Sequence, residues 1–218
     1  DDVELGSPEH NTVCRPPDRT SSEYLMLANR LKGSLEAITS LTGQINAITA
    51  MAETLVECLS RSGTIWTAGN GGSAAQALHF SEELVGRYRN NRRPLGSAML
   101  SSDPTLLSCT ANDYGFDQVF ARPLEALASA DDAVLVLSTS GNSTNIVLAL
   151  QAAKERGCAT VGLFGGDGGA CKPLCDHAIV VDATDSAFIQ DAHQVAIHLL
   201  CEAIEQWAMA TEPEEATS

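Results

Sequence analysis

Two side chains that could act on a bound ligand follow a glycine-rich stretch in the first half of the chain. His79 and Glu83 stand four residues apart, shortly after Gly69-Asn70-Gly71-Gly72-Ser73. If a helix opens at Ser73, both side chains lie on one of its faces. An imidazole and a carboxylate placed in this way could bind a metal ion, transfer a proton or form an ordinary surface pair. The spacing alone favours the surface pair.

A second imidazole comes from a distant stretch and changes that balance. Gln190, Gln194 and His198 are spaced by four, and eight helical residues advance only about 80° beyond whole turns. The three side chains therefore lie on one ridge of a predicted helix, whereas His193 falls off it and is expected to pack or to face solvent. Two helices that each offer an imidazole could together bind a metal ion or transfer a proton.

A hydroxyl-rich turn, Ser138-Thr139-Ser140-Gly141-Asn142-Ser143, follows an apolar run directly. Hydroxyls and the N–H groups of a helix start form a phosphate site without a lysine, and ligands of open α/β sheets bind at this edge. The alternative is an ordinary loop with Ser143 as the helix N-cap. The number of hydroxyls favours the phosphate site. The 69–73 turn is a second anion-friendly loop, but it matches neither the Walker A nor the dinucleotide pattern, so nucleotide binding is not supported.

Two further features leave alternatives open. Asn112-Asp113 follows a predicted helix and could be either a capped turn or a pair that holds sugar hydroxyls. Four of the thirteen Lys and Arg residues cluster at the end of the predicted 73–88 helix and just after it, where they could form a solvated basic loop or place positive charge beside an anionic substrate. These residues are Arg87, Arg89, Arg92 and Arg93.

The elements that must position these residues alternate between strand and helix from residue 64 onward. Apolar runs predict strands at 64–68, 97–100, 133–137, 159–164 and 178–181. Periodic stretches predict helices at 73–88, 104–111, 117–128, 143–156, 170–174 and 185–210. Because the 133–137 strand is apolar without alternation, it is expected to be buried on both faces. The predicted fold is α/β, a doubly wound parallel sheet flanked by helices on both faces.

Two amphipathic helices precede the first strand. The first begins near a capping box formed by Thr20 and Glu23, and the second covers 44–60. Their apolar stripes could cover the domain or pack against a second subunit. We expect residues 1–19 to form a flexible tail, 20–210 a single domain and 211–218 an acidic tail.

Composition excludes several classes of partner. The net charge of −15 argues against broad binding to nucleic acid or to anionic membranes, and the chain lacks an apolar run long enough to span a bilayer. Seven cysteines without a framework spacing predict reduced thiols in a cytoplasmic protein. Cys171 and Cys175 are the only close pair, which is a poor basis for a structural zinc site.

Taken together, the motifs resemble the sugar isomerase (SIS) domain, and more narrowly the phosphoheptose isomerases. The resemblance spans about residues 22–208 in order. Its motifs are AGNGGS at 68–73, HFSEELVGRY at 79–88, ANDYGF at 111–116, LSTSGNS at 137–143, GDGG at 166–169 and IQDAHQVAIH at 189–198. It implies a homotetramer with active sites between subunits, and a zinc-dependent conversion of sedoheptulose 7-phosphate to a manno-heptose 7-phosphate through an enediol.

The resemblance also assigns roles to residues. It implies zinc ligands at His79, Glu83, Gln190 and His198, with Glu83 as the base and His198 as the paired acid/base. The phosphate would be held by Ser138, Thr139, Ser140 and Ser143. The sugar site would be lined by Asn70, Gly71, Gly72, Ser73, Asn112, Asp113 and Gln190, with Arg87 close by. Some members carry Asp-Arg where this chain has Ala187 and Phe188, so the role of that aspartate does not carry over.

Two other functions share this pattern. Replication-initiation regulators that bind DnaA have the same fold and the same loops, but they lack the glutamate and histidine that stand here at Glu83 and His198. An isomerase or sensor for another sugar phosphate would keep the phosphate loops whatever sugar it binds. The presence of Glu83 and His198 favours the enzyme.

Overall fold

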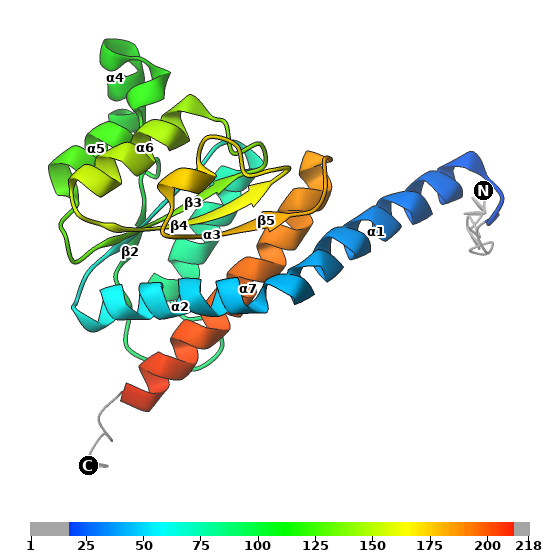
Figure 1. The fold of residues 1–218 in the computed structure, drawn as a ribbon, viewed down its shortest axis with the longest axis horizontal. Coiled ribbons are helices and arrows are strands. Elements are labelled where there is room, and N and C mark those ends of the chain that lie inside the picture. The colour runs from blue at the N-terminus through cyan, green and yellow to red at the C-terminus, as the bar shows by residue number, and fades with distance from the viewer. Residues whose placement is uncertain (1–17, 212–218) are drawn as a thin grey trace, which may run out of the picture.

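The computed structural model describes residues 18–211 (Figure 1). The predicted tails at 1–19 and 211–218 lie outside this range except at their inner ends. Before the first strand come α1 (Ser22–Ser40), the 3₁₀ turn η1 (Leu41–Gln44) and α2 (Ile45–Ser60). None of the helices in the described range is long and apolar enough to cross a membrane.

The core of the molecule is a parallel sheet of five strands. They are β1 (Ile65–Gly69), β2 (Ser97–Met99), β3 (Ala133–Ser138), β4 (Ala159–Gly165) and β5 (His177–Val181), in the order β2-β1-β3-β4-β5. Every residue of the central strand β3 is buried, as its unbroken apolar run predicts. The predicted doubly wound parallel sheet is confirmed.

Helices cover both faces of this sheet (Figure 1). The remaining elements are α3 (Gly72–Val85), α4 (Pro104–Tyr114), η2 (Phe116–Gln118), α5 (Ala121–Leu127), α6 (Thr144–Glu155), η3 (Lys172–Leu174) and α7 (Ser186–Thr211). Leu135 and Leu137 pack into one core with α2, α3 and α7, whereas Val134 and Val136 pack into another with α5 and α6. This alternation follows from the two-residue period of a strand.

Several predicted boundaries are wrong by a few residues. Helix α3 begins at Gly72 and already ends at Val85, so the segment 86–93 after it is a loop rather than more helix. The predicted 117–128 helix is divided into η2 and α5. The capping box is also wrong: Ser21 is the N-cap of α1, and Thr20 instead donates to Asp18.

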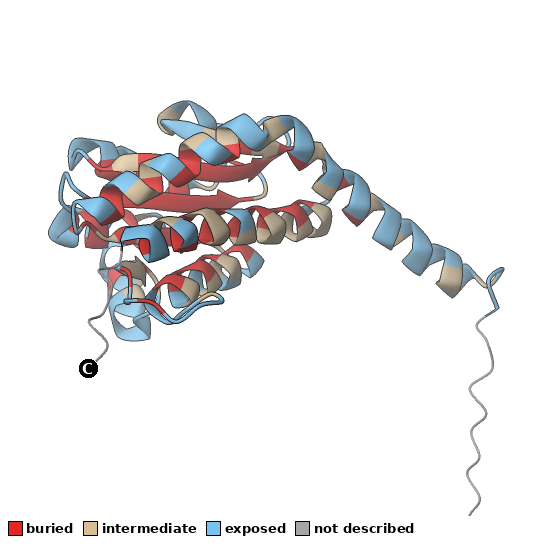
Figure 2. Cartoon of the chain, turned by 90° about the horizontal axis from the view of Figure 1, so that it is seen from below, coloured by how far each residue is buried: buried red, intermediate tan, exposed pale blue. Residues whose placement is uncertain are grey.

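Helix α1 extends away from the domain, and most of its outer half is exposed (Figure 2). The turn η1 between α1 and α2 covers part of the sheet edge at β5. The Gln44 side chain donates to Val180 O at 2.8 Å and accepts from Val180 N at 2.9 Å, so its amide imitates a further strand beside β5. An edge strand with unpaired backbone groups invites pairing with other chains, and this amide blocks that position.

Candidate active site

The site begins where the two central strands end. Strands β1 and β3 are neighbours, but the helices that follow them cover opposite faces: α3 lies on one and α6 on the other. At such a switch point the connecting loops diverge and leave a crevice for ligands. Asn70 follows β1, and its side-chain amide exchanges two hydrogen bonds of 2.9 Å with that of Asn145 on α6. The two loops are thereby tied together.

A small polar hollow of about 70 Å³ occupies this crevice. Its lining is Asn70, Ser73, Leu137, Ser138, Thr139, Ser140, Ser143 and Gln190. Ser143 is the N-cap residue of α6, yet its hydroxyl makes no capping hydrogen bond, and it lies 3.5 Å from the Ser138 hydroxyl. Hydroxyls that face a hollow beside a helix start suit a bound anion better than they suit a plain capped loop.

The glycine-rich turn borders the same hollow. Gly71 has a φ of +56°, which favours glycine, and α3 starts at the next residue. A Cβ on Gly72 would lie 2.6 Å from Gln190 Nε2, so this turn leaves room for the Gln190 side chain. The structure thus brings Asn70, Gly72 and Gln190 together around one opening.

The predicted His/Glu cluster forms between α3 and α7, which pack side by side. His79 Nε2 lies 3.2 Å from His198 Nε2 and 3.5 Å from Glu83 Oε1. The Glu83 side chain is 15% exposed, so it is partly withdrawn from water. Atoms of His79, Glu82 and Glu83 that can bind a metal also lie within 4.8 Å of one another. This cluster could therefore hold a metal ion, transfer protons or do both.

Further polar side chains orient the two imidazoles. His79 Nδ1 faces Glu82 Oε2 at 3.5 Å, which leaves Nε2 to point at His198 and Glu83. Gln194 Nε2 contacts His198 Nε2 at 3.1 Å, and Gln76 donates to the backbone of Gln190 and to Gln194. Partners of this kind fix the tautomer and direction of a ligating or catalytic imidazole.

The sequence pattern missed some of these partners. Glu82 stands three residues after His79 and Gln76 three before it, spacings that could have identified both. Asn145 carries no comparable signal, because it meets Asn70 only through the fold.

The remaining predicted site residues lie elsewhere. Asn112 and Asp113 belong to the last turn of α4, not to a turn after it, and both are exposed. Asn112 Nδ2 donates to Asp113 Oδ1 at 2.7 Å, and neither residue lines the hollow. Arg87 is exposed on the loop after α3. Their roles toward substrate remain predictions.

The four arginines of the basic cluster do not act as one group, either as a solvated loop or as charge beside a substrate. Arg92 is buried and donates to the backbone carbonyls of Glu83 and Leu84, so it closes the end of α3. Arg89 instead forms an ion pair with Glu202 at 2.8 Å, and the Arg93 guanidinium lies 5.3 Å from the centre of the Trp207 ring.

Comparisons with known proteins identify the family to which this chain belongs. A family model described as "SIS domain" matches residues 28–165. A phosphoheptose isomerase of Pelobacter propionicus is 50% identical over 156 residues, which are 72% of this chain and 82% of that protein. One from Helicobacter pylori strain P12 is 42% identical over 189 residues, covering 87% and 95%. The chain belongs to the phosphoheptose isomerases of the SIS domain family.

A solved phosphoheptose isomerase has the same fold. The structure from Neisseria gonorrhoeae matches with a TM-score of 0.80 at 34% identity, covering 85% of this chain and all of that one. The resemblance that the motifs predicted is therefore confirmed, and this chain is an isomerase with the α/β fold of its relatives.

The other histidine of α7, His193, has a structural position in this phosphoheptose isomerase. His193 is fully buried, and its Nε2 contacts Phe164 O at the end of β4 at 3.2 Å. Burial lowers the pKa of His193 from its ordinary 6.5 to about 4, although the hydrogen bond to Phe164 acts in the opposite direction. It packs against the sheet, one of the two placements expected for it.

This position predicts a pH dependence of stability. Between about pH 6.5 and 4 the unfolded chain binds a proton at His193 that the folded chain does not bind. Lowering the pH through this range therefore reduces the free energy of unfolding, by roughly 3 kcal/mol from this group. Urea unfolding at pH 7 and pH 4.5, at fixed protomer concentration, should show that acidification lowers the unfolding free energy of His193→Gln by less than it lowers that of the unaltered protein. His177→Gln, at an exposed position on β5, is the control and should behave as the unaltered protein does. Equal acid losses in His193→Gln and the unaltered protein would contradict this account.

Proposed function

We propose that this phosphoheptose isomerase converts D-sedoheptulose 7-phosphate to D-glycero-D-manno-heptose 7-phosphate, the first step toward a nucleotide-activated heptose. The observation that carries the proposal is the convergence of Glu83, His79 and His198 next to a hollow lined by hydroxyls. A base, an acid and an anion site are the parts that an aldose–ketose isomerisation of a sugar phosphate requires.

In this mechanism Glu83 moves the carbon-bound proton. Its carboxylate removes a proton from C1 of the ketose and returns it to C2, with an enediol in between. His198 gives a proton to the oxygen on C2 and accepts the one on the C1 hydroxyl, so a C2 carbonyl becomes a C1 aldehyde without net gain or loss. A proton α to a carbonyl is weakly acidic, which is why a positioned base and a group that stabilises the enediolate are needed.

The other end of the substrate is held away from the reaction. Ser138, Thr139, Ser140 and Ser143 bind the phosphate, together with the N–H groups at the start of α6. Asn70, Gly71, Gly72, Ser73 and Gln190 line the sugar. Binding energy from the phosphate can then be used to orient C1 and C2 against Glu83.

The donor atoms in the cluster fit a zinc ion. Nitrogen and oxygen ligands at roughly 2.0–2.1 Å from a tetrahedral zinc lie roughly 3.3–3.4 Å apart. The separations from His79 Nε2 to His198 Nε2 and to Glu83 Oε1 are 3.2 and 3.5 Å. We propose His79, Glu83, His198 and Gln190 as its ligands. Bound there, zinc would polarise the oxygens on C1 and C2.

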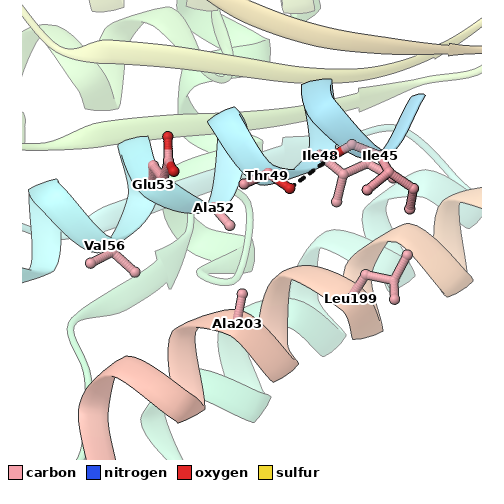
Figure 3. A pocket seen from close by; sticks show the side chains of 8 residues that line it. All are labelled: Ile45, Ile48, Thr49, Ala52, Glu53, Val56, Leu199 and Ala203. Carbon is pink, nitrogen blue, oxygen red and sulfur yellow. Dashed lines mark hydrogen bonds between the residues drawn. The ribbon is translucent and has the colours of Figure 1, made fainter. Parts of the chain in front are cut away.

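A homotetramer in the cytoplasm completes the proposal. Helix α1 exposes Leu25, Met26, Leu27, Leu31 and Leu35, each at least half exposed. An apolar groove of about 330 Å³ lies between α2 and α7 (Figure 3). Surfaces of this kind support burial against further copies of the chain. Sites shared between copies would also explain why Asn112 and Asp113 do not line the hollow of their own chain. The six cysteines in the described range are all free, which supports the cytoplasm.

Incubation with sedoheptulose 7-phosphate tests the activity, with NMR detection of an aldoheptose phosphate. We expect turnover, about one zinc per subunit and a tetramer by light scattering. Removal of the metal with a chelator should abolish turnover, and zinc should restore it. Zinc-loaded protein that gives no product would overturn the proposal and favour a regulator that binds DnaA. Turnover of a different sugar phosphate alone would favour an isomerase for that sugar.

A further inference from the structure

A second buried acid lies on α7 beyond the proposed site. Glu205 stands seven residues after His198, about 20° short of two full turns, so both side chains leave α7 on the same side. Only 4% of Glu205 is exposed. A carboxylate this deeply buried needs partners to offset the loss of water. The proposed chemistry gives it no part, so its partners define its role.

Those partners belong to the loop that follows α3. Glu205 Oε1 accepts hydrogen bonds from Arg89 N at 3.0 Å and Asn90 N at 3.1 Å, and Oε2 accepts one from Asn90 Nδ2 at 3.0 Å. Burial acts to raise the pKa of Glu205, but these hydrogen bonds and the nearby Arg92 outweigh it and lower the pKa. Glu205 is therefore an ionised anchor that ties the loop to α7.

A buried arginine extends this anchor to the proposed base. Arg92 Nε lies 3.9 Å from Glu205 Oε1. The same guanidinium donates from Nη2 to Glu83 O at 2.7 Å and from Nη1 to Leu84 O at 2.9 Å. A planar guanidinium fixes several acceptors in one geometry, which an ammonium cannot do. Arg92 thus connects the last turn of α3, at Glu83 itself, to Glu205 on α7.

The anchored loop also reaches the proposed acid. Tyr88 directly precedes Arg89, and its half-buried ring lies 5.9 Å, centre to centre, from the His198 ring. The two rings are tilted by 36°. A shift of the loop would therefore change the surroundings of His198 at the same time as it released the end of α3.

We infer that Glu205 and Arg92 form a positioning clamp that sets the placement of Glu83 relative to His198. This inference rests on the proposed function, because it takes those two residues as the base and the acid. The clamp touches neither substrate nor metal. It acts through the backbone of Glu83 on one side and through Tyr88 on the other. A displacement of about 1 Å between reacting groups can cost about 100-fold in rate, so such a clamp affects turnover more than binding.

Glu205→Gln tests the clamp with little change in shape. We expect kcat to fall about 10- to 100-fold while KM changes less than about threefold. Arg92→Lys keeps the charge but loses the planar set of N–H donors. It should likewise lower kcat while changing KM little. The control is Asp132→Asn. Asp132 is 5% exposed and accepts hydrogen bonds from Thr64 N, Trp66 Nε1 and Ser129 N, but it lies at the opposite, amino end of the strands.

The outcomes separate the clamp from simple loss of stability. Asp132→Asn should lose stability yet keep the kcat of the unaltered protein, per folded molecule and at equal metal content. If Glu205→Gln also keeps that kcat, or if it raises only KM, the clamp is overturned. If the unaltered protein does not isomerise the sugar, the proposed function fails instead. The clamp is then judged by the ring proton shifts of His198 in NMR spectra, which Glu205→Gln should change and Asp132→Asn should not.

Discussion

Replacement of Glu83 by glutamine is expected to lower kcat by about 10³-fold, within the range that a positioned general base contributes. The amide keeps the shape of the side chain and an oxygen that can face His79, but it cannot accept a proton from carbon. The protein should stay folded, because the Glu83 side chain makes its charged contact only with His79, at 3.5 Å, among the described ion pairs. A change of less than about 1 kcal/mol in unfolding free energy is expected.

The neighbouring acid provides a matched control for this variant. Glu82 is exposed and lies on the other side of His79, with its Oε2 facing Nδ1 at 3.5 Å. Glu82→Gln should lower kcat less than about 10-fold, because it only helps to orient the imidazole. Initial rates, unfolding curves and metal content measured on both variants make the comparison. If Glu83→Gln keeps a tenth or more of kcat, Glu83 is not the general base.

The fold was accessible from sequence because its signals are local and repeated. The unbroken apolar run of β3 and the alternation of strand and helix predicted a parallel sheet with two covered faces, as the structure has it. Boundaries were less accessible where side chains from elsewhere decide them. Helix α3 ends at Val85 because Arg92 and Leu95 take up the carbonyls of its last turn, and neither interaction leaves a trace in the helix pattern.

The site divides in the same way. Four-residue spacing grouped His79 with Glu83, and Gln190 with His198, because a helix turns this spacing into one face. The two faces meet because α3 packs on α7. Before the structure, only the family resemblance predicted that these residues lie together. The sequence pattern did not indicate the parts played by Asn145, Tyr88 and Glu205, because each contacts its partner across distant segments of the chain. Sequence reasoning identified the groups that we propose to react, and it missed the side chains that contact them.

Replacement of Gly141 by alanine is expected to have the largest effect of any single substitution in the proposed phosphate loop. Gly141 has a φ of +62°, and a Cβ there would collide with the backbone oxygen of Gly168. The hydroxyl turn is also bonded to this second loop, since Gly141 O accepts from Cys171 N at 2.9 Å. Alanine must therefore push the two loops apart, at a cost of about 3 kcal/mol or more in stability.

Gly166 separates the clash from the backbone strain. It has nearly the same φ, +63°, but nothing lies within 4 Å of a Cβ placed on it. Gly166→Ala should therefore cost only about 1–2 kcal/mol, the strain of the left-handed conformation. Because only Gly141→Ala displaces the hydroxyls of Ser138 and Ser140, it alone should raise KM for the phosphorylated sugar, by about 10-fold or more. Urea unfolding and initial-rate kinetics on the two variants give both numbers. Equal KM values would mean that the close packing of these loops does not shape the proposed phosphate site.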